Sequence, residues 1–173
     1  MRKEHPKRIL VIRFGAIGDI ILTFPAILAL KKAWPDAHIS YLTKSKFAGL
    51  VRPQHFIDDV VCLEPDEGIQ SLRQKIAIAE IDGIIDLHSQ LRSKALRSFN
   101  AIPTLAKKKP RSLWESSSVR LGWARHQPKN KIVEDHHQLI DSVVGHTVTR
   151  EKIHFQVSAE QNTAAQLRLK QVG

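Results

Sequence analysis

Cysteine is almost absent from this sequence, which contains only Cys62 and therefore cannot build an internal disulfide framework. Such sparse cysteine use suits a reducing cytoplasm, and the apolar neighbours in DVVCLE predict that Cys62 is an inert core residue. No apolar run approaches the ~20 residues that a membrane-spanning helix needs. The charged start, MRKEHPKR, is followed by the short apolar run ILVI and not by a signal-peptide core. We therefore expect a cytoplasmic protein.

Internal repeats of the solenoid type and low-complexity linkers are also missing. The chain has 173 residues, of which 42% are hydrophobic and 25% charged, as in ordinary globular proteins. This length is sufficient for one domain with a substantial core and is too short for two.

Positive charge is concentrated in one segment. Residues 92–131 contain eleven Lys or Arg and a single acidic residue, Glu115, so this segment accounts for the whole net charge of +10. The rest of the chain is balanced. The pattern indicates a polyanionic partner, which could be nucleic acid, an anionic membrane surface, or a phosphorylated or carboxylated substrate.

Short apolar runs alternate with longer amphipathic stretches along the chain. Strands are predicted over 8–13, 38–43, 59–64, 82–87, 102–106 and 153–157. The first, third and fourth runs are almost continuously apolar, as in parallel strands that are covered on both faces. Helices are predicted over 19–34 with a kink at Pro25, and over 44–52, 68–80, 90–100, 133–144 ended by Gly145, and 158–171 followed by Gly173. This alternation predicts an α/β fold, a Rossmann-like doubly wound parallel sheet.

The segment IRFGAIGDIILTFP, residues 12–25, leads from the first strand into a helix through two glycines. Ligands of open α/β sheets bind beyond the carboxyl ends of the strands, where Gly15 and Gly18 would allow a tight turn. Asp19 would project into that crevice, or it could be only a helix N-cap. A dinucleotide site is less well supported, because FGAIGD supplies only part of the G-x-G-x-x-G pattern, and no Gly-Lys-Ser/Thr follows for a phosphate loop.

The stretch ILVIRFGAIGDIILTFPAILALKKAWPDAHISYLT resembles the opening of the lipopolysaccharide heptosyltransferases, glycosyltransferase family 9. Its features are an apolar strand, a Gly-Asp turn, a helix with Thr-x-Pro-Ala, and a Lys-Lys-x-x-Pro-Asp-Ala exit. DLHSQLRS at 86–93 is similar to a second loop of that family, and VEDHHQLIDSVVG at 133–145 to a third segment. The three matches occur in the family's order.

This resemblance implies the N-terminal half of a GT-B glycosyltransferase, an enzyme with its active site between two Rossmann-like domains. Residues 1–157 would be the acceptor-binding domain, and residues 158–173 a helix leading to a C-terminal donor-binding domain that this chain lacks. Asp19 would be the general base of an inverting transfer from ADP-heptose to the lipopolysaccharide inner core. The donor would bind mainly the second domain, no other cofactor is needed, and the chain alone would be inactive.

The resemblance also implies an acceptor site built by Gly18, His88, Ser89, Gln90 and Arg92. Arg92 would offer a bidentate fork to phosphates or carboxylates of the acceptor. The alternative is structural: Ser89 caps the next helix and Arg92 is a solvated helix residue.

The basic patch of Lys107, Lys108, Lys109 and Arg111 fits an acceptor such as Kdo-lipid A in the anionic inner face of the cytoplasmic membrane. Trp114 and Trp123 could act as interfacial anchors, or these residues form a solvated face and core. The chain would then be a peripheral membrane protein. A non-catalytic polyanion-binding module is the main alternative, although no nucleic-acid recognition motif is visible and nucleic acid is not expected. The adjacent His136 and His137 point about 100° apart on a helix, so no metal site is predicted.

Overall fold

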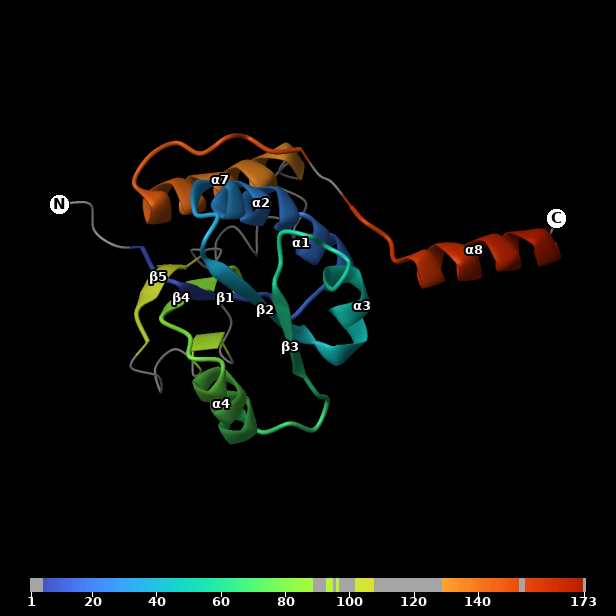
Figure 1. Cartoon of the computed structure of the whole chain (residues 1–173), viewed down its shortest axis with the longest axis horizontal. Helices are drawn as coiled ribbons and strands as arrows, with labels where there is room; N and C mark the ends of the chain where they lie inside the picture. Colours follow the sequence, from blue (N-terminus) through green and yellow to red (C-terminus); the bar gives the residue numbers. More distant parts are fainter. Residues whose placement is uncertain are drawn as a thin grey trace, which may run out of the picture.

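The computed structural model describes residues 5–88, 93–94, 96, 102–107, 129–152 and 155–172. Its centre is a five-stranded sheet in the order β3-β2-β1-β4-β5, in which every neighbouring pair is parallel (Figure 1). The strands are β1 (Arg8–Ile12), β2 (His38–Lys44), β3 (Asp59–Leu63), β4 (Gly83–Asp86) and β5 (Thr104–Lys107). The five strands predicted between residues 8 and 106 are all present.

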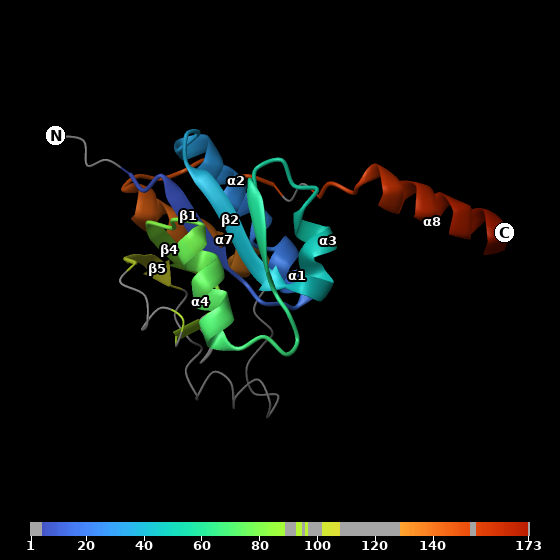
Figure 2. The ribbon, with the colours of Figure 1, turned by 60° about the horizontal axis from the view of Figure 1, so that its bottom comes forward.

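Helices cover both faces of this sheet. Helices α2 (Phe24–Ala33) and α7 (Lys129–Val144) lie on one face, and α4 (Ile69–Ile78) lies on the other (Figures 1 and 2). The chain runs outward from β1 through β2 to β3 and then returns to place β4 on the other side of β1. The predicted doubly wound, Rossmann-like α/β fold is therefore confirmed. The order of the strands reverses between β1 and β4, and such a switch point is where ligands collect in these folds.

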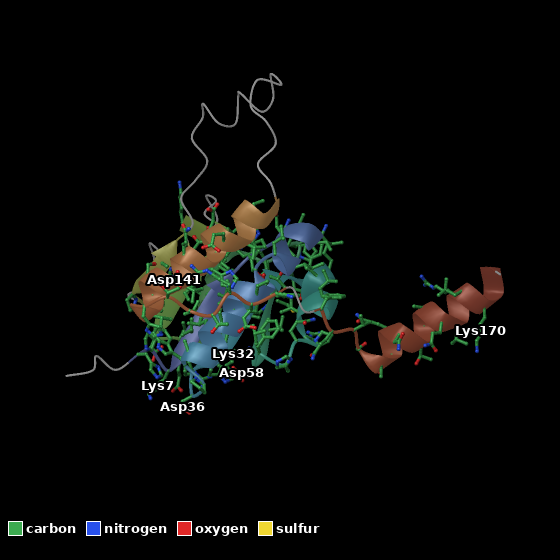
Figure 3. The ribbon with its side chains drawn as sticks, turned by 90° about the horizontal axis from the view of Figure 1, so that it is seen from above. Lys7, Lys32, Asp36, Asp58, Asp141 and Lys170 are labelled. Carbon is green, nitrogen blue, oxygen red and sulfur yellow. The ribbon has the colours of Figure 1, made fainter. Side chains whose placement is uncertain are left out.

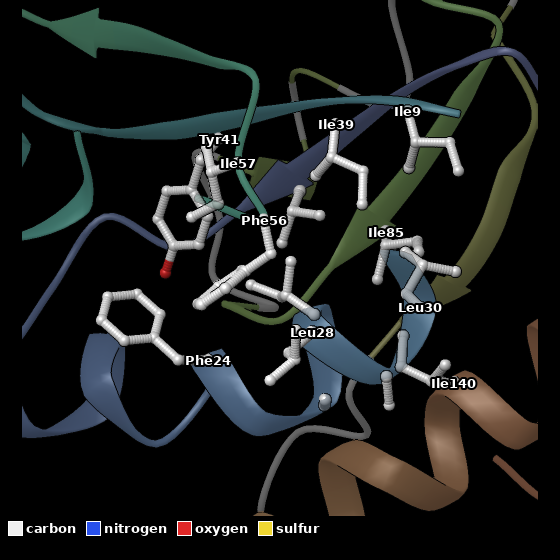
Figure 4. Close-up of a cluster of buried hydrophobic side chains, with 14 of the residues drawn as sticks. Ile9, Phe24, Leu28, Leu30, Ile39, Tyr41, Phe56, Ile57, Ile85 and Ile140 are labelled. Atoms are coloured by element: carbon white, nitrogen blue, oxygen red, sulfur yellow. The ribbon is translucent and has the colours of Figure 1, made fainter. Parts of the chain in front are cut away.

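Alternate residues of β1 feed two separate apolar cores. Ile9 and Val11 pack with α2 and α7, whereas Leu10 and Ile12 pack with α4. The first core also contains Tyr41, Phe24, Phe56 and Ile140, and Figure 4 shows these side chains packed between the sheet and the two helices. Fully burying one such side chain contributes roughly 1.5–3 kcal/mol, so the two cores fix the sheet that carries the site.

The first predicted helix is two helices. Helix α1 (Ile17–Ile21) ends before Leu22 and Thr23, and α2 then begins at Phe24. Pro25 occupies the first turn of α2, where its missing N–H costs nothing because no intrahelical partner exists there. The predicted kink is thus a complete break, which separates the short helix that carries Asp19 from the long core helix.

The next helices follow the predictions more closely. The stretch predicted over 44–52 becomes a 3₁₀ turn, η1 (Ser45–Phe47), and α3 (Ala48–Val51), because Lys44 extends β2. Helix α7 begins four residues earlier than predicted, at Lys129 and not at Val133, and ends as predicted before Gly145, whose φ is +85°. This left-handed conformation favours glycine.

The predicted burial of β3 and of Cys62 is wrong. Strand β3 lies at an edge of the sheet, and its residues alternate between exposed or half-buried and buried positions. Cys62 is half-buried, and an Arg52 guanidinium nitrogen lies 3.7 Å from its Sγ. The apolar run alone does not distinguish an edge strand from a central one, because edge position depends on which strand pairs last.

The predicted strand over 153–157 is also wrong for the residues that the structure describes, 155–157. The side-chain amide of Gln54 takes the place of a neighbouring strand: its Oε1 accepts from the Gln156 N–H at 3.2 Å, and its Nε2 donates to the Gln156 carbonyl at 3.0 Å. The chain then continues into α8 (Ala159–Val172), which extends away from the sheet and its covering helices (Figures 1 and 3).

Several predictions lie outside the described residues. These are most of the helix over 90–100, Gly173, Trp114 and Trp123. Within the part of the chain that is described, no helix is long and apolar enough to cross a membrane.

Candidate active site

Asp19 lies at the carboxyl edge of the sheet, in the helix that follows β1. Residues 13–16 connect Ile12 to α1, and Ala16, not Asp19, is the N-cap of that helix. Among the described residues, no main-chain amide donates to the Asp19 carboxylate. The Asp19 side chain is 45% exposed. The N-cap interpretation of Asp19 is therefore wrong, and the carboxylate is left at the surface of the edge where ligands bind.

Arg13 binds the Asp19 carboxylate. Its guanidinium forms an ion pair with Oδ2 of Asp19, and its other terminal nitrogen donates to the Leu87 carbonyl at 2.7 Å. The Arg13 side chain is only 11% exposed. Sequence reasoning missed Arg13, because a single basic residue after an apolar strand looks like the end of the strand. The signal that was available is its position, directly after the strand that precedes the Gly-Asp turn.

The two glycines of the turn have different roles. Gly15 has a φ of +153°, and a Cβ there would lie 2.7 Å from the ring of Phe47, so a side chain is excluded by conformation and by space. Gly18 has no such constraint, because a Cβ there would meet nothing within 4 Å. The prediction that both glycines allow a tight turn holds for Gly15 only. The space around Gly18, in the first turn of α1, is instead open.

The end of β4 meets the same turn. Asp86 is fully buried, and its Oδ1 accepts from the His88 N–H at 2.9 Å, which bends the chain after the strand. The half-buried His88 ring packs edge-on against Phe14, with ring centroids 4.9 Å apart. Since Phe14 follows Arg13, the structure brings His88 to the β1–α1 turn, as the sequence predicted from the shared edge.

Beneath the turn, Tyr41 and Thr23 form a buried hydrogen-bonded pair. The Thr23 hydroxyl donates to the Ile20 carbonyl at 2.6 Å, so the Tyr41 hydroxyl, 3.1 Å away, donates to Thr23. Burial raises the pKa of Tyr41 well above its usual range, which keeps this hydroxyl protonated. Tyr41 therefore supports α1 and is no candidate for a base.

A surface hollow of about 290 Å³ lies along the same edge of the sheet, where β2 and β3 end. Two of its lining residues are lysines, and sequence reasoning assigned them no role. The available signal was their position directly after the strand at 38–43. The lining residues are Lys44, Ser45, Lys46, Leu63, Glu64 and Pro65.

Most of the other predicted site residues lie outside the described part of the chain. Ser89, Gln90 and Arg92 lie outside the described residues, as do Lys108, Lys109 and Arg111, and Lys107 is the last residue of β5. Their roles in acceptor or polyanion binding stay predictions.

The paired histidines of α7 have structural contacts. His136 is buried, with Nδ1 3.1 Å from the Leu22 carbonyl. His137 is buried as well; its Nδ1 lies 3.0 Å from the Val133 carbonyl, and its Nε2 accepts from the Glu151 N–H at 3.2 Å. Both ring nitrogens of His137 are thus engaged. In the described ranges, no group of three His, Cys, Asp or Glu side chains could hold a metal ion.

These features define a class: a Rossmann-like α/β domain with a half-exposed carboxylate at the switch point between β1 and β4. No protein-family model matches the sequence, and no curated protein matches it.

Solved structures do match the fold. One is a glycosyl transferase family 9 protein from Veillonella parvula, with a TM-score of 0.75, 20% identity and 96% of this chain covered. Another is the E. coli ADP-heptose lps heptosyltransferase II, with a TM-score of 0.65, 17% identity and 94% coverage. A third is the E. coli heptosyltransferase WaaC with ADP-2-deoxy-2-fluoro heptose, with a TM-score of 0.58, 18% identity and 84% coverage.

The match covers 49%, 50% and 51% of those three chains, so this chain spans about half their length. The fold that the sequence resemblance implied is therefore confirmed: this chain folds like part of the glycosyltransferases named above.

Proposed function

We propose that this chain is the acceptor-binding domain of an inverting glycosyltransferase that transfers heptose from ADP-heptose to the lipopolysaccharide inner core. Asp19 is the general base. The observation that carries this proposal is the state of the Asp19 carboxylate: one oxygen is held by Arg13, Oδ1 accepts no hydrogen bond from the described residues, and the side chain is 45% exposed. The shared fold with heptosyltransferase structures supports the reaction class.

The proposed chemistry needs little from this half of the enzyme. Asp19 takes the proton of the acceptor hydroxyl as its oxygen bonds to the anomeric carbon, while the bond from that carbon to the nucleotide diphosphate breaks on the opposite side. The anomeric configuration is thereby inverted and ADP leaves as an anion. Residues 1–157 supply the acceptor site, and 158–173 lead to a donor-binding domain. This chain alone binds acceptor and transfers nothing.

The acceptor is an anionic sugar such as Kdo-lipid A at the inner face of the cytoplasmic membrane. Lys44 and Lys46 in the edge hollow supply positive charge on the same edge as Asp19, and His88 lies by the β1–α1 turn. Ser89, Gln90 and Arg92 extend this site, and the patch from Lys107 to Arg111 holds the anionic surface.

The test is a transfer assay on the protein that carries this chain together with a nucleotide-sugar-binding domain, with ADP-heptose and Kdo-lipid A. Asp19→Asn keeps an oxygen acceptor for Arg13 but cannot take a proton, so kcat falls roughly 100-fold or more. The matched control is Asp36→Asn, an exposed aspartate just before β2 at the opposite edge of the sheet, which leaves kcat within about twofold. Undiminished kcat in Asp19→Asn overturns the proposal.

A binding experiment on the 173-residue chain tests the acceptor site separately. Titration with a soluble phosphorylated Kdo-containing oligosaccharide is expected to shift the amide NMR signals of Gly18, Asp19 and His88. Lys44→Gln with Lys46→Gln weakens this binding several-fold, and the loss disappears at high salt because the attraction is electrostatic. Signals that move only elsewhere in the domain contradict the assigned acceptor site.

A further inference from the structure

Arg13 joins three parts of the carboxyl edge of the sheet. Its main chain continues β1, with the Arg13 N–H donating to the Leu42 carbonyl of β2 at 3.0 Å. Its side chain donates to the Leu87 carbonyl just after β4 and pairs with Asp19 in α1. The guanidinium is therefore fixed by the sheet and holds Asp19 of α1.

Asp19 is the only counter-charge that Arg13 has in the described structure. The guanidinium is largely buried, and its Nε has no hydrogen-bond partner among the described residues. A buried cation that loses its one anionic partner is strongly disfavoured, so this pairing persists while the domain is folded. The pairing occupies Oδ2 only, which orients the carboxylate with Oδ1 away from the guanidinium.

We infer that Arg13 is a positioning residue for the transfer reaction: it fixes the side-chain rotamer of Asp19 so that Oδ1 faces the acceptor hydroxyl. This inference rests on the proposed role of Asp19. Among the described residues, α1 itself supplies no hydrogen bond to the Asp19 carboxylate, so its orientation depends on Arg13. Orientation of this kind affects the rate strongly, since a displacement of about 1 Å at a reacting group can cost roughly 100-fold.

The hydrogen bond to the Leu87 carbonyl also brings Arg13 close to the predicted acceptor site. His88 is the next residue, and its ring packs on Phe14, the residue after Arg13. The guanidinium that holds Asp19 therefore also contacts the residue next to the predicted acceptor contact, whereas His88 itself is held by Asp86 and Phe14.

The experiment compares Arg13→Gln and Arg13→Lys in the transfer assay described above. Arg13→Gln lowers kcat roughly 10- to 100-fold and changes KM by less than about twofold, because Arg13 does not touch the acceptor. Arg13→Lys keeps the charge but lacks the two terminal nitrogens with which Arg13 reaches the Leu87 carbonyl and Asp19 separately, and gives an intermediate kcat. The matched control is Lys31→Gln, since Lys31 also bridges a carbonyl, that of Ala37, and a carboxylate, that of Asp58, at the other edge. Its kcat stays within about twofold of the wild type.

A double variant separates positioning from a general loss of structure. If Arg13 acts through Asp19, then Arg13→Gln combined with Asp19→Asn is no slower than Asp19→Asn alone. A purely structural role makes the two losses multiply, and that result overturns the inference. Asp19→Asn with full activity instead overturns the proposed function, so the two failures are distinguishable.

A measurement on the 173-residue chain does not depend on activity. Three-bond Hα–Hβ couplings of Asp19 report one dominant rotamer in the wild type and averaged values in Arg13→Lys. The Lys31→Gln chain keeps the wild-type couplings. Identical Asp19 couplings in the wild type and Arg13→Lys also contradict the inference, and Arg13→Lys serves here because it retains the buried charge if Arg13→Gln does not fold.

Discussion

The two edges of the sheet use the same residue type in opposite ways. At the amino edge, Asp82 accepts main-chain N–H groups from Lys7 and Arg8 at 2.8 and 2.9 Å, and Asp58 accepts from the Ile39 N–H at 2.7 Å and from Lys31. At the carboxyl edge, the one partner of Asp19 within the described part of the chain is the guanidinium of Arg13. Figure 3 shows Asp58 near Lys7 and Asp36, at the end of the domain where strands begin.

The difference separates structural carboxylates from chemically available ones. A carboxylate that is saturated by main-chain amides is stabilised as an anion and has no oxygen to offer to a substrate. A carboxylate with one occupied oxygen can still accept a proton. The comparison therefore assigns stability to Asp82 and Asp58, and it agrees with the role of base that we propose for Asp19.

The largest effect on stability is expected at Asp82. Asp82→Ala removes the acceptor of two amides at the start of β1 and lowers the free energy of unfolding by about 3 kcal/mol, because hydrogen bonds to charged groups are the stronger kind. Urea denaturation measures this loss. If Asp82→Ala is no less stable than the wild type, the two edges do not differ in the way described.

Glu67 shows that position alone does not decide the state of a carboxylate. It follows β3 at the carboxyl edge, and yet both of its oxygens accept hydrogen bonds. Burial raises its pKa, but Lys75, Ser71 and the Glu64 N–H outweigh this and lower the pKa of Glu67 to about 2. Glu67→Gln therefore costs about 2 kcal/mol at neutral pH.

The cost in Glu67→Gln depends on pH. The folded pKa lies below the unfolded value of about 4.3, so the wild-type advantage is complete above that value and is lost as the pH falls toward 2. Urea denaturation across pH 2–7 measures this. A difference between wild type and variant that does not change with pH contradicts the prediction.

Asp58→Asn is expected to cost less stability than Glu67→Gln, with the same dependence on pH. Burial raises its pKa, but the Ile39 N–H and Lys31 outweigh burial and hold the pKa of Asp58 below its usual range. Asp58→Asn should lower the stability by about 1–2 kcal/mol at pH 7. The loss shrinks as the pH falls below about 4, where the unfolded chain is protonated first. Thermal melts at pH 7 and pH 3 provide the check, with Asp36→Asn as an exposed control.

The smallest effect is local. Gln54→Ala removes both hydrogen bonds to Gln156 and leaves the global free energy of unfolding within about 1–2 kcal/mol of the wild type. Amide hydrogen exchange at Gln156 nevertheless becomes several-fold faster, while exchange in β1 is unchanged. Equal acceleration in β1 means that Gln54 supports the whole domain and not this one segment.

Much of the fold could be predicted from local sequence signals. The runs that form β1 and β4 are almost continuously apolar because these strands lie between two helical layers, and Gly145 ends α7 because its left-handed conformation suits glycine. The failures are non-local. The contact that replaces a strand at Gln156 comes from Gln54, and the exposure of β3 depends on the final order of the strands.

In the candidate site, too, local features could be predicted and non-local contacts could not. The position of Asp19 in the Gly-Asp pair after β1 was visible in the sequence, and so was its shared edge with His88. The role of Arg13 was not, because it depends on the Leu87 carbonyl and on which oxygen of Asp19 is occupied. These contacts join residues that are distant in the sequence, and only the folded sheet brings them together.

The missing side chain at position 15 links two distant parts of the chain. The ring of Phe47 occupies the volume that a methyl group on Gly15 would need, so the first loop of the domain and the turn after β2 share a single space. A smaller residue at 47 would relieve only the crowding, since the backbone angle at 15 would still disfavour a side chain. Sequence change at these two positions is therefore one-directional: residue 47 can become smaller while residue 15 stays glycine, but residue 15 cannot gain a side chain first without displacing the Phe47 ring.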